Sequence, residues 1–157
     1  MSLLRIRMLF GWGLLLLSSA VLAGTAGDGV SVEAPYVRAV PPGQPNSAAF
    51  MSLHNSTDQS YQLVGASSDV AEVVELHTHT MEDGMMRMRQ VDQIELPAGD
   101  TVSLKPGGLH IMLIGLKHKL VPDDDIRLTL KFSDGSEQEV SAPVKKIRMT
   151  MGGMGGH

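Results

Sequence analysis

The sequence predicts an all-β domain, built as an antiparallel β-sandwich or barrel. Many short segments alternate apolar and polar residues, which is the period of a strand with one buried face. Turn-forming residues separate these segments at close spacing, and no long stretch carries the helical period. The chain has 157 residues and a hydrophobic fraction of 43%, which is sufficient for the core of one domain.

The first half of the chain contains four expected strands. They cover residues 32–40, 48–54, 61–66 and 70–79, and the last is expected to end in a loop. Pro35 interrupts the first strand because proline cannot donate to a ladder, and the proline-rich stretch 41–45 forms a loop for the same reason. The apolar run 70–76 also fits a helical turn, because a short apolar run does not separate strand from helix.

The second half of the chain repeats the theme of strand, turn and strand. Its expected strands cover residues 85–91, 94–96, 101–104, 109–114, 126–132 and 139–144. Residues 81–84 form the first turn, and Asp134-Gly135 is a tight-turn signal between the last two strands. The clearest alternation lies at 126–132, where every second residue is Ile, Leu, Leu and Phe in turn.

Residues 1–23 are expected to be a signal peptide that is removed near Ala23-Gly24. Two arginines precede the apolar run 8–17, and residues 21–23 supply small side chains for cleavage. The run is too short for a good transmembrane span, so no stable membrane insertion is expected after cleavage; an uncleaved anchor is the alternative. No cysteine lies near the cleavage point, which excludes lipid attachment through that residue.

The mature chain is expected to divide into three parts. Residues 24–30 are small and polar and predict a flexible leader, residues 31–146 form the folded domain, and residues 147–157 form a flexible tail rich in Met, His and Gly.

Composition excludes several functions for the mature chain. Removing two of the 13 basic residues and none of the 17 acidic residues takes the net charge from −4 to −6. An acidic chain is poorly suited to a phosphate backbone, so no nucleic-acid partner is expected. The chain has no cysteine, which removes disulfides, thiolate ligands and thiol redox chemistry, and leaves its 11 methionines as the only sulfur.

The segment 109–114 carries the first sign of a metal site. Strand geometry places Leu109, Ile111 and Leu113 on one face, and His110 and Met112 together on the other. Imidazole nitrogen and soft thioether sulfur on one face suit copper. Two residues from other expected strands complete a candidate set with His110 and Met112. They are His77 and Met88, and each of these strands lies beside a turn.

The chemistry of this set favours Cu(I). Thioethers need no deprotonation and reject the hard cations, and a set without negative charge would allow the ion to be released. Blue-copper electron transfer is disfavoured because it needs a cysteine thiolate. The chain has no helical HExxH zinc motif and no nucleophile elbow, so no enzyme is expected.

Each of these residues also has a structural explanation. Met88 and Met112, taken singly, are more often packing residues of a sheet, and a lone strand histidine more often makes a hydrogen bond. The combination is more specific, because a four-position template at these residue frequencies arises by chance in about one such sequence in a thousand.

The same residues resemble the periplasmic copper chaperones of the PCu(A)C type. That family's motif is a histidine, ten residues, a methionine, twenty-one residues, and then histidine, any residue and methionine. All four motif positions match, as His77, Met88, His110 and Met112. The wider resemblance runs from Tyr36 to Val144 and includes Arg38 and Asn55, which are interpreted as structural.

The resemblance implies a cupredoxin-like Greek-key β-sandwich that binds Cu(I) in the periplasm and supplies copper for cytochrome c oxidase assembly. The implied recipient is a Sco-type thiol protein or an oxidase subunit, and the chain is expected to be a monomer. Some members carry a methionine directly after the first histidine, where this chain has Thr78. His79, His54 and His118 are expected not to be ligands, with His79 at the rim of the site.

The tail resembles extensions of some members, where a second copper, as Cu(I) or Cu(II), could bind. Its candidate ligands are Met149, Met151, Met154 and His157. A solvated, frayed terminus is the alternative for the tail. For the whole chain two other functions remain open: copper buffering or tolerance, and a metal-free secreted β-sandwich that acts as an interaction module.

Overall fold

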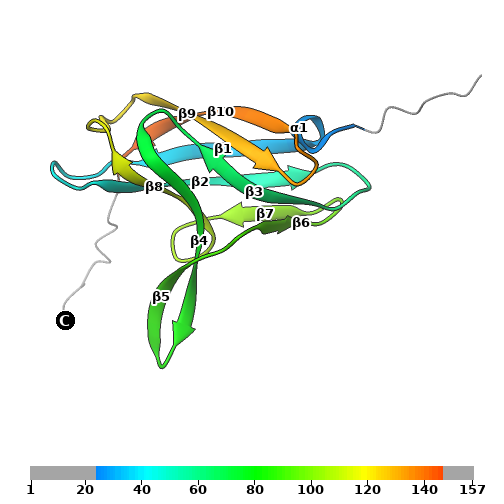
Figure 1. Cartoon of the computed structure of the whole chain (residues 1–157), viewed down its shortest axis with the longest axis horizontal. Helices are drawn as coiled ribbons and strands as arrows, with labels where there is room; N and C mark the ends of the chain where they lie inside the picture. The colour runs from blue at the N-terminus through cyan, green and yellow to red at the C-terminus, as the bar shows by residue number, and fades with distance from the viewer. Residues whose placement is uncertain (1–23, 147–157) are drawn as a thin grey trace, which may run out of the picture.

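The computed structural model describes residues 24–146, which form one short helix and ten strands (Figure 1). The helix is α1 (Ala26–Gly29), and the strands are β1 (Val30–Arg38), β2 (Asn46–Asn55), β3 (Tyr61–Ser67), β4 (Ala71–Glu82), β5 (Met85–Gln90), β6 (Ile94–Leu96), β7 (Thr101–Leu104), β8 (His110–Leu116), β9 (Asp125–Phe132) and β10 (Glu137–Lys145). The all-β prediction is confirmed. The predicted signal peptide and the tail with Met149, Met151, Met154 and His157 lie outside the described residues.

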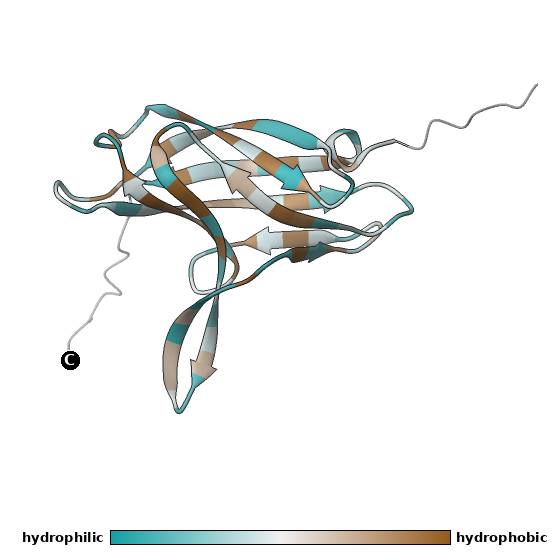
Figure 2. Ribbon diagram, viewed as in Figure 1, coloured by the Kyte–Doolittle hydropathy of each residue, from teal (hydrophilic) through white to brown (hydrophobic). Residues whose placement is uncertain are grey.

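The strands form two layers that pack face to face. One layer has the order β5-β4-β8-β2-β1, and the other has the order β10-β9-β3-β6. Leu53 and Leu113 of the first layer share one buried core with Leu63 and Leu130 of the second. Hydrophobic and hydrophilic residues alternate along these strands, as the brown and teal bands of Figure 2 show. Strands such as β9 bury every second side chain, so the alternation in their sequence indicates which residues enter the core.

One strand pair departs from the expected antiparallel pattern. β1 and β10 run parallel, with Val37 opposite Val144, and so join the two layers edge to edge. The other pairings are antiparallel. The first and last strands thus close the described domain through a pairing that leaves no local sequence signal, because the two strands are distant in the chain.

Two segments differ from their expected structure. Residues 24–30, expected to be a flexible leader, contain α1, where Ala26 is buried and its N–H donates to Asp134 Oδ2 at 2.7 Å. The strand expected at 70–79 runs on to Glu82, because β5 pairs with its last six residues, from His77 to Glu82. Residues 71–76 therefore belong to a strand and not to a helical turn, and Val70 lies in the turn before it. In the part of the chain that is described, no helix is long and apolar enough to cross a membrane.

The β2 strand pairs with two different strands along one of its edges. Its first half pairs with β8, from Asn46 opposite Ile114 to Ala49 opposite Ile111. Its second half pairs with β7, from Met51 opposite Leu104 onward. The connection between β7 and β8 therefore lies beside the middle of β2, and β8 begins there with His110.

Candidate metal centre

Three adjacent strands bring the four predicted metal ligands into one region. β4 lies between β5 and β8, and His77 is directly opposite His110 in the β4–β8 pairing. Met112 follows His110 two residues along β8, and Met88 of β5 is opposite His79 of β4. Residues that are far apart in the sequence are therefore cross-strand neighbours, as a metal site on a sheet requires.

The β8 strand separates core residues from site residues as the alternation predicts. Ile111 and Leu113 are fully buried in the hydrophobic core. His110 and Met112 point to the other face, into a cavity of about 370 Å³. The candidate ligands that line this cavity are Met88, His110, Met112 and His79. His77 is not among the lining residues, although its ring centroid is 5.9 Å from that of His110.

His110 is held in the form that binds a metal. Its side chain is 2% exposed, and its Nδ1 lies 2.8 Å from the carbonyl oxygen of Gly108. A carbonyl can only accept, so Nδ1 carries the proton and Nε2 keeps a free lone pair. Burial lowers the pKa of His110, because a buried imidazolium loses hydration. At neutral pH the ring is therefore uncharged and pre-oriented for coordination through Nε2.

His77 is oriented by a carboxylate. Its Nε2 donates to Glu75 Oε2 at 2.8 Å, and its Nδ1 is buried with no hydrogen-bond partner among the described residues. A hydrogen bond from one ring nitrogen to a carboxylate commonly fixes a histidine that binds a metal through the other nitrogen. His77 therefore has Nδ1 available as a metal-binding atom. The residue lies beside the cavity and does not line it.

His79, which the sequence interpretation put at the rim of the site as a non-ligand, lines the cavity. Its ring stacks on His110, with centroids 5.1 Å apart and an angle of 29° between the planes. Its Nδ1 is also buried without a partner in residues 24–146. A buried polar atom left unsatisfied costs roughly 1 to 3 kcal/mol, which a bound cation would recover. The signal for His79 was its position two residues after His77, which puts both rings on the same face of β4.

The thioethers are needed to complete a site here. Within the described residues, no three His, Asp or Glu side chains are grouped so that they could hold a metal by themselves. Met112 is half-buried, and Met88 is 45% exposed at the outer side of the cavity. Imidazole and thioether donors together, without a carboxylate among the lining residues, match the ligand preferences of Cu(I).

Aromatic and cationic groups form the wall opposite β4. Phe50 lies against His110 with ring centroids 6.2 Å apart, and the Arg38 guanidinium carbon lies 5.3 Å from the centre of the Phe50 ring. Phe50 is buried and keeps water from one side of the imidazole. Arg38 places a positive charge at the cavity, which disfavours a second cationic group such as a protonated His110.

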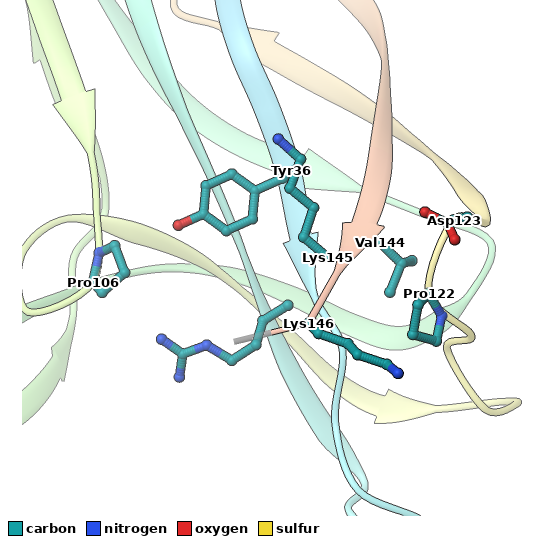
Figure 3. Close-up of a pocket in the computed structure, with 8 residues that line it drawn as sticks. Tyr36, Pro106, Pro122, Asp123, Val144, Lys145 and Lys146 are labelled. Atoms are coloured by element: carbon teal, nitrogen blue, oxygen red, sulfur yellow. The ribbon is translucent and has the colours of Figure 1, made fainter. Parts of the chain in front are cut away.

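A second, larger cavity of about 750 Å³ lies next to the first and shares Arg38 and Pro106 with it. Figure 3 shows its lining residues, among them Tyr36, Lys145 and Lys146. The Lys145 ammonium lies 5.3 Å from the centre of the Tyr36 ring. The lining of this larger cavity has neither imidazole nor thioether groups. The smaller cavity has both, so it is the candidate metal centre.

Comparison with known proteins identifies the family and the fold of this chain. The family described as "Putative lipoprotein LpqE-like" matches residues 30–144, which is most of the chain. The chain belongs to the LpqE-like family, which is the PCu(A)C family of the sequence resemblance. A relative in this family, "Putative lipoprotein Lxx21020" of Leifsonia xyli subsp. xyli (strain CTCB07), is 40% identical over 129 residues, covering 82% of this chain and 76% of the relative.

Solved structures share the fold of this LpqE-like domain. The Cu(I)-bound solution structure of DR1885 from Deinococcus radiodurans is 40% identical, covers 74% of this chain and 78% of DR1885, and has a TM-score of 0.62. Its apo form is 35% identical, with a TM-score of 0.61 and coverage of 92% and 97%. The copper-bound PCuAC domain from PmoF2 is 27% identical, with a TM-score of 0.64 and coverage of 76% and 94%. The cupredoxin-like fold and the family resemblance are therefore confirmed.

Proposed function

We propose that this protein is a Cu(I)-binding chaperone, a carrier and not an enzyme. The observation that carries the proposal is the convergence of His110, Met112 and Met88 on one open cavity. Beside it lie two buried imidazole nitrogens that have no hydrogen-bond partner within residues 24–146. The solved relatives support it, since DR1885 is described with Cu(I) and the PmoF2 domain with copper.

His110 Nε2 and the thioethers of Met112 and Met88 would hold the ion in this cavity, with one imidazole of β4 as the fourth donor. The predicted fourth donor is His77, and His79 is its structural competitor. All of these donors are neutral, so the ion is held by soft coordination and not by opposite charge. Such a site can give its ion to an acceptor with cysteine thiolates, which bind Cu(I) more strongly.

We place this carrier in the periplasm, where it would supply copper for cytochrome c oxidase assembly. A thiol protein of the Sco type, or an oxidase subunit, is the proposed recipient. The family's description as lipoproteins supports an exported protein. The absence of cysteine supports a carrier in an oxidising compartment, because thioether ligands cannot form disulfides there.

A transfer experiment tests the carrier function. Cu(I)-loaded protein is mixed anaerobically with a Cu-free dithiol acceptor, and the copper content of both is measured after separation. We expect nearly all copper on the acceptor. Retention of copper by this protein at equal concentrations would contradict delivery and favour buffering. Loss of oxidase copper in cells that lack the protein, restored by the wild-type gene, would extend the result to oxidase assembly.

Alanine substitutions at His77 and His79 decide which β4 imidazole is the ligand. Loss of a direct ligand should weaken Cu(I) binding by more than about 100-fold, since even the loss of a supporting hydrogen bond costs roughly 10 to 100-fold. We expect His77→Ala to show the larger loss, because Glu75 already orients its free Nδ1. Competition against a Cu(I) chelator measures both variants.

The Glu75→Gln variant is the control for this chelator competition. Glu75→Gln should weaken binding by roughly 10-fold if His77 is the ligand, because it alters only the group that orients the ring. A large loss in His79→Ala, with His77→Ala and Glu75→Gln near the wild-type affinity, would transfer the ligand role to His79.

A further inference from the structure

We propose that Met81 and Met86 form a second, outer Cu(I)-binding position on the β4–β5 hairpin. We call these two residues the outer pair. The proposal rests on the proposed function, because it gives the copper carrier a place to receive an ion before the ion reaches the cavity. It adds a site outside the four predicted ligands and outside the cavity lining.

The register of the hairpin places the outer pair on the same face as the cavity ligands. Met81 is directly opposite Met86, and His79 is directly opposite Met88. Directly opposed residues project to the same side, with Cβ atoms roughly 4.5 to 5.5 Å apart, and alternate positions along a strand share a face. The outer pair therefore continues the row of imidazole and thioether groups from the cavity toward the hairpin turn.

The opposite face of the hairpin carries its charges. Thr78 is opposite Arg89, and Thr80 is opposite Arg87. Glu82 accepts hydrogen bonds from the Arg89 guanidinium, with the Nε–Oε1 distance at 2.8 Å, and lies 3.7 Å from Arg87 Nε. The ion pairs thus brace the hairpin from one side, and the strand register assigns the methionine row to the other.

The exposure of the outer pair places both side chains outside the hydrophobic core of the described domain. Met81 is 67% exposed and Met86 is 58% exposed. The hairpin projects from the body of the domain, so both side chains can be reached by a copper donor (Figure 1). Methionine is long and flexible, and two opposed thioethers can close on one soft ion without movement of the backbone.

The chemistry defines the ligand as a soft monovalent cation. Two neutral thioethers bind Cu(I) and reject hard divalent cations. His79 and Met88 lie next along the row, so an ion on the outer pair is adjacent to the cavity wall. No redox step is involved, because the ion stays Cu(I) throughout.

Methyl NMR on the full-length mature protein tests this position. Methionine ε-methyl groups are labelled with ¹³C, assigned with single Met→Leu variants, and followed during anaerobic addition of Cu(I). We expect Met88 and Met112 to shift first, as the cavity fills. Met81 and Met86 should then shift together as Cu(I) is added beyond that point. Met81→Leu should abolish the shift of Met86, because one thioether alone does not chelate.

Met85 provides the matched control. It lies on the same hairpin and is 57% exposed, but it is opposite Glu82 and so belongs to the charged face. Its methyl signal should stay unchanged, and Met85→Leu should leave the response of the outer pair intact. Shifts of Met88 and Met112 with Met81 and Met86 unmoved would overturn the outer pair and leave the proposed function standing. If none of the four shifts, both proposals are wrong.

Discussion

Cu(I) affinity should fall by more than about 100-fold in both His110→Ala and Met112→Ala, because each removes a direct donor atom from the cavity. His110 is the more sensitive position, since its Nε2 is the donor whose protonation and direction are already set by Gly108. Met112 contributes a thioether that no neighbouring residue on β8 can replace. Competition against a Cu(I) chelator under anaerobic conditions measures the change.

Two controls separate ligand loss from damage to the fold. Met112→Leu keeps the packing volume of the side chain and removes the sulfur, so it should lose affinity with thermal unfolding close to the wild type. His118→Ala changes an exposed histidine away from the cavity and should bind as the wild type does. Wild-type affinity in His110→Ala or in Met112→Leu would remove that residue from the site.

Asn55→Ala should lower the free energy of unfolding by about 2 to 4 kcal/mol, because one buried side chain loses four hydrogen bonds at once. Asn55 is fully buried at the end of β2. Its Nδ2 donates to the carbonyl oxygens of Gln59 at 2.7 Å and Leu96 at 2.9 Å. Its Oδ1 accepts from the backbone N–H of Thr57 at 3.1 Å and from the Thr57 hydroxyl at 2.7 Å. Denaturant unfolding measures the loss.

Asn46→Ala is the matched control at the other end of β2. Asn46 is exposed, and its Oδ1 accepts one 3.2 Å hydrogen bond from the Gly115 N–H. Its substitution should cost less than about 1 kcal/mol.

Asn55 lies seven residues from Ala48, the β2 neighbour of Met112, or about 23 Å along the strand. Asn55→Ala should therefore keep its Cu(I) affinity while folded. Equal free energies of unfolding for Asn55→Ala and Asn46→Ala would contradict the structural role of the Asn55 hydrogen bonds.

Local alternation predicted most of the fold. In β9, the residues Ile126, Leu128, Leu130 and Phe132 are all buried, as their spacing indicates. The same rule separated His110 and Met112 from the core residues of β8. These predictions succeed because a strand with one buried face repeats every second residue, whatever the strand pairs with.

Features that depend on distant pairing could not be read in this way. The parallel pairing of β1 with β10 depends on how the two layers meet, and no local pattern encodes it. The burial of Ala26 depends on Asp134, more than a hundred residues later in the chain. Both are tertiary contacts, and the second overrides a weak local preference of residues 24–30 for a flexible leader.

In the candidate site, too, the sequence predicted some features and left others to tertiary contacts. The family spacing selects residues that lie close together in the structure, because cross-strand register converts sequence distance into proximity. It did not distinguish His77 from His79, since residues two apart on β4 share a face. The hydrogen bond from His77 to Glu75 and the contact of His79 with the cavity depend on side-chain rotamers, which spacing does not specify.

X-ray absorption at the copper edge of the Cu(I)-loaded, full-length mature protein, with one ion per chain, tests the central claim most directly. The expected spectrum is that of Cu(I) with both sulfur and nitrogen neighbours, because thioethers and imidazoles converge on the same cavity. In Met112→Leu the sulfur contribution should decrease. A spectrum with nitrogen and oxygen neighbours alone would contradict a histidine and methionine copper site in this protein.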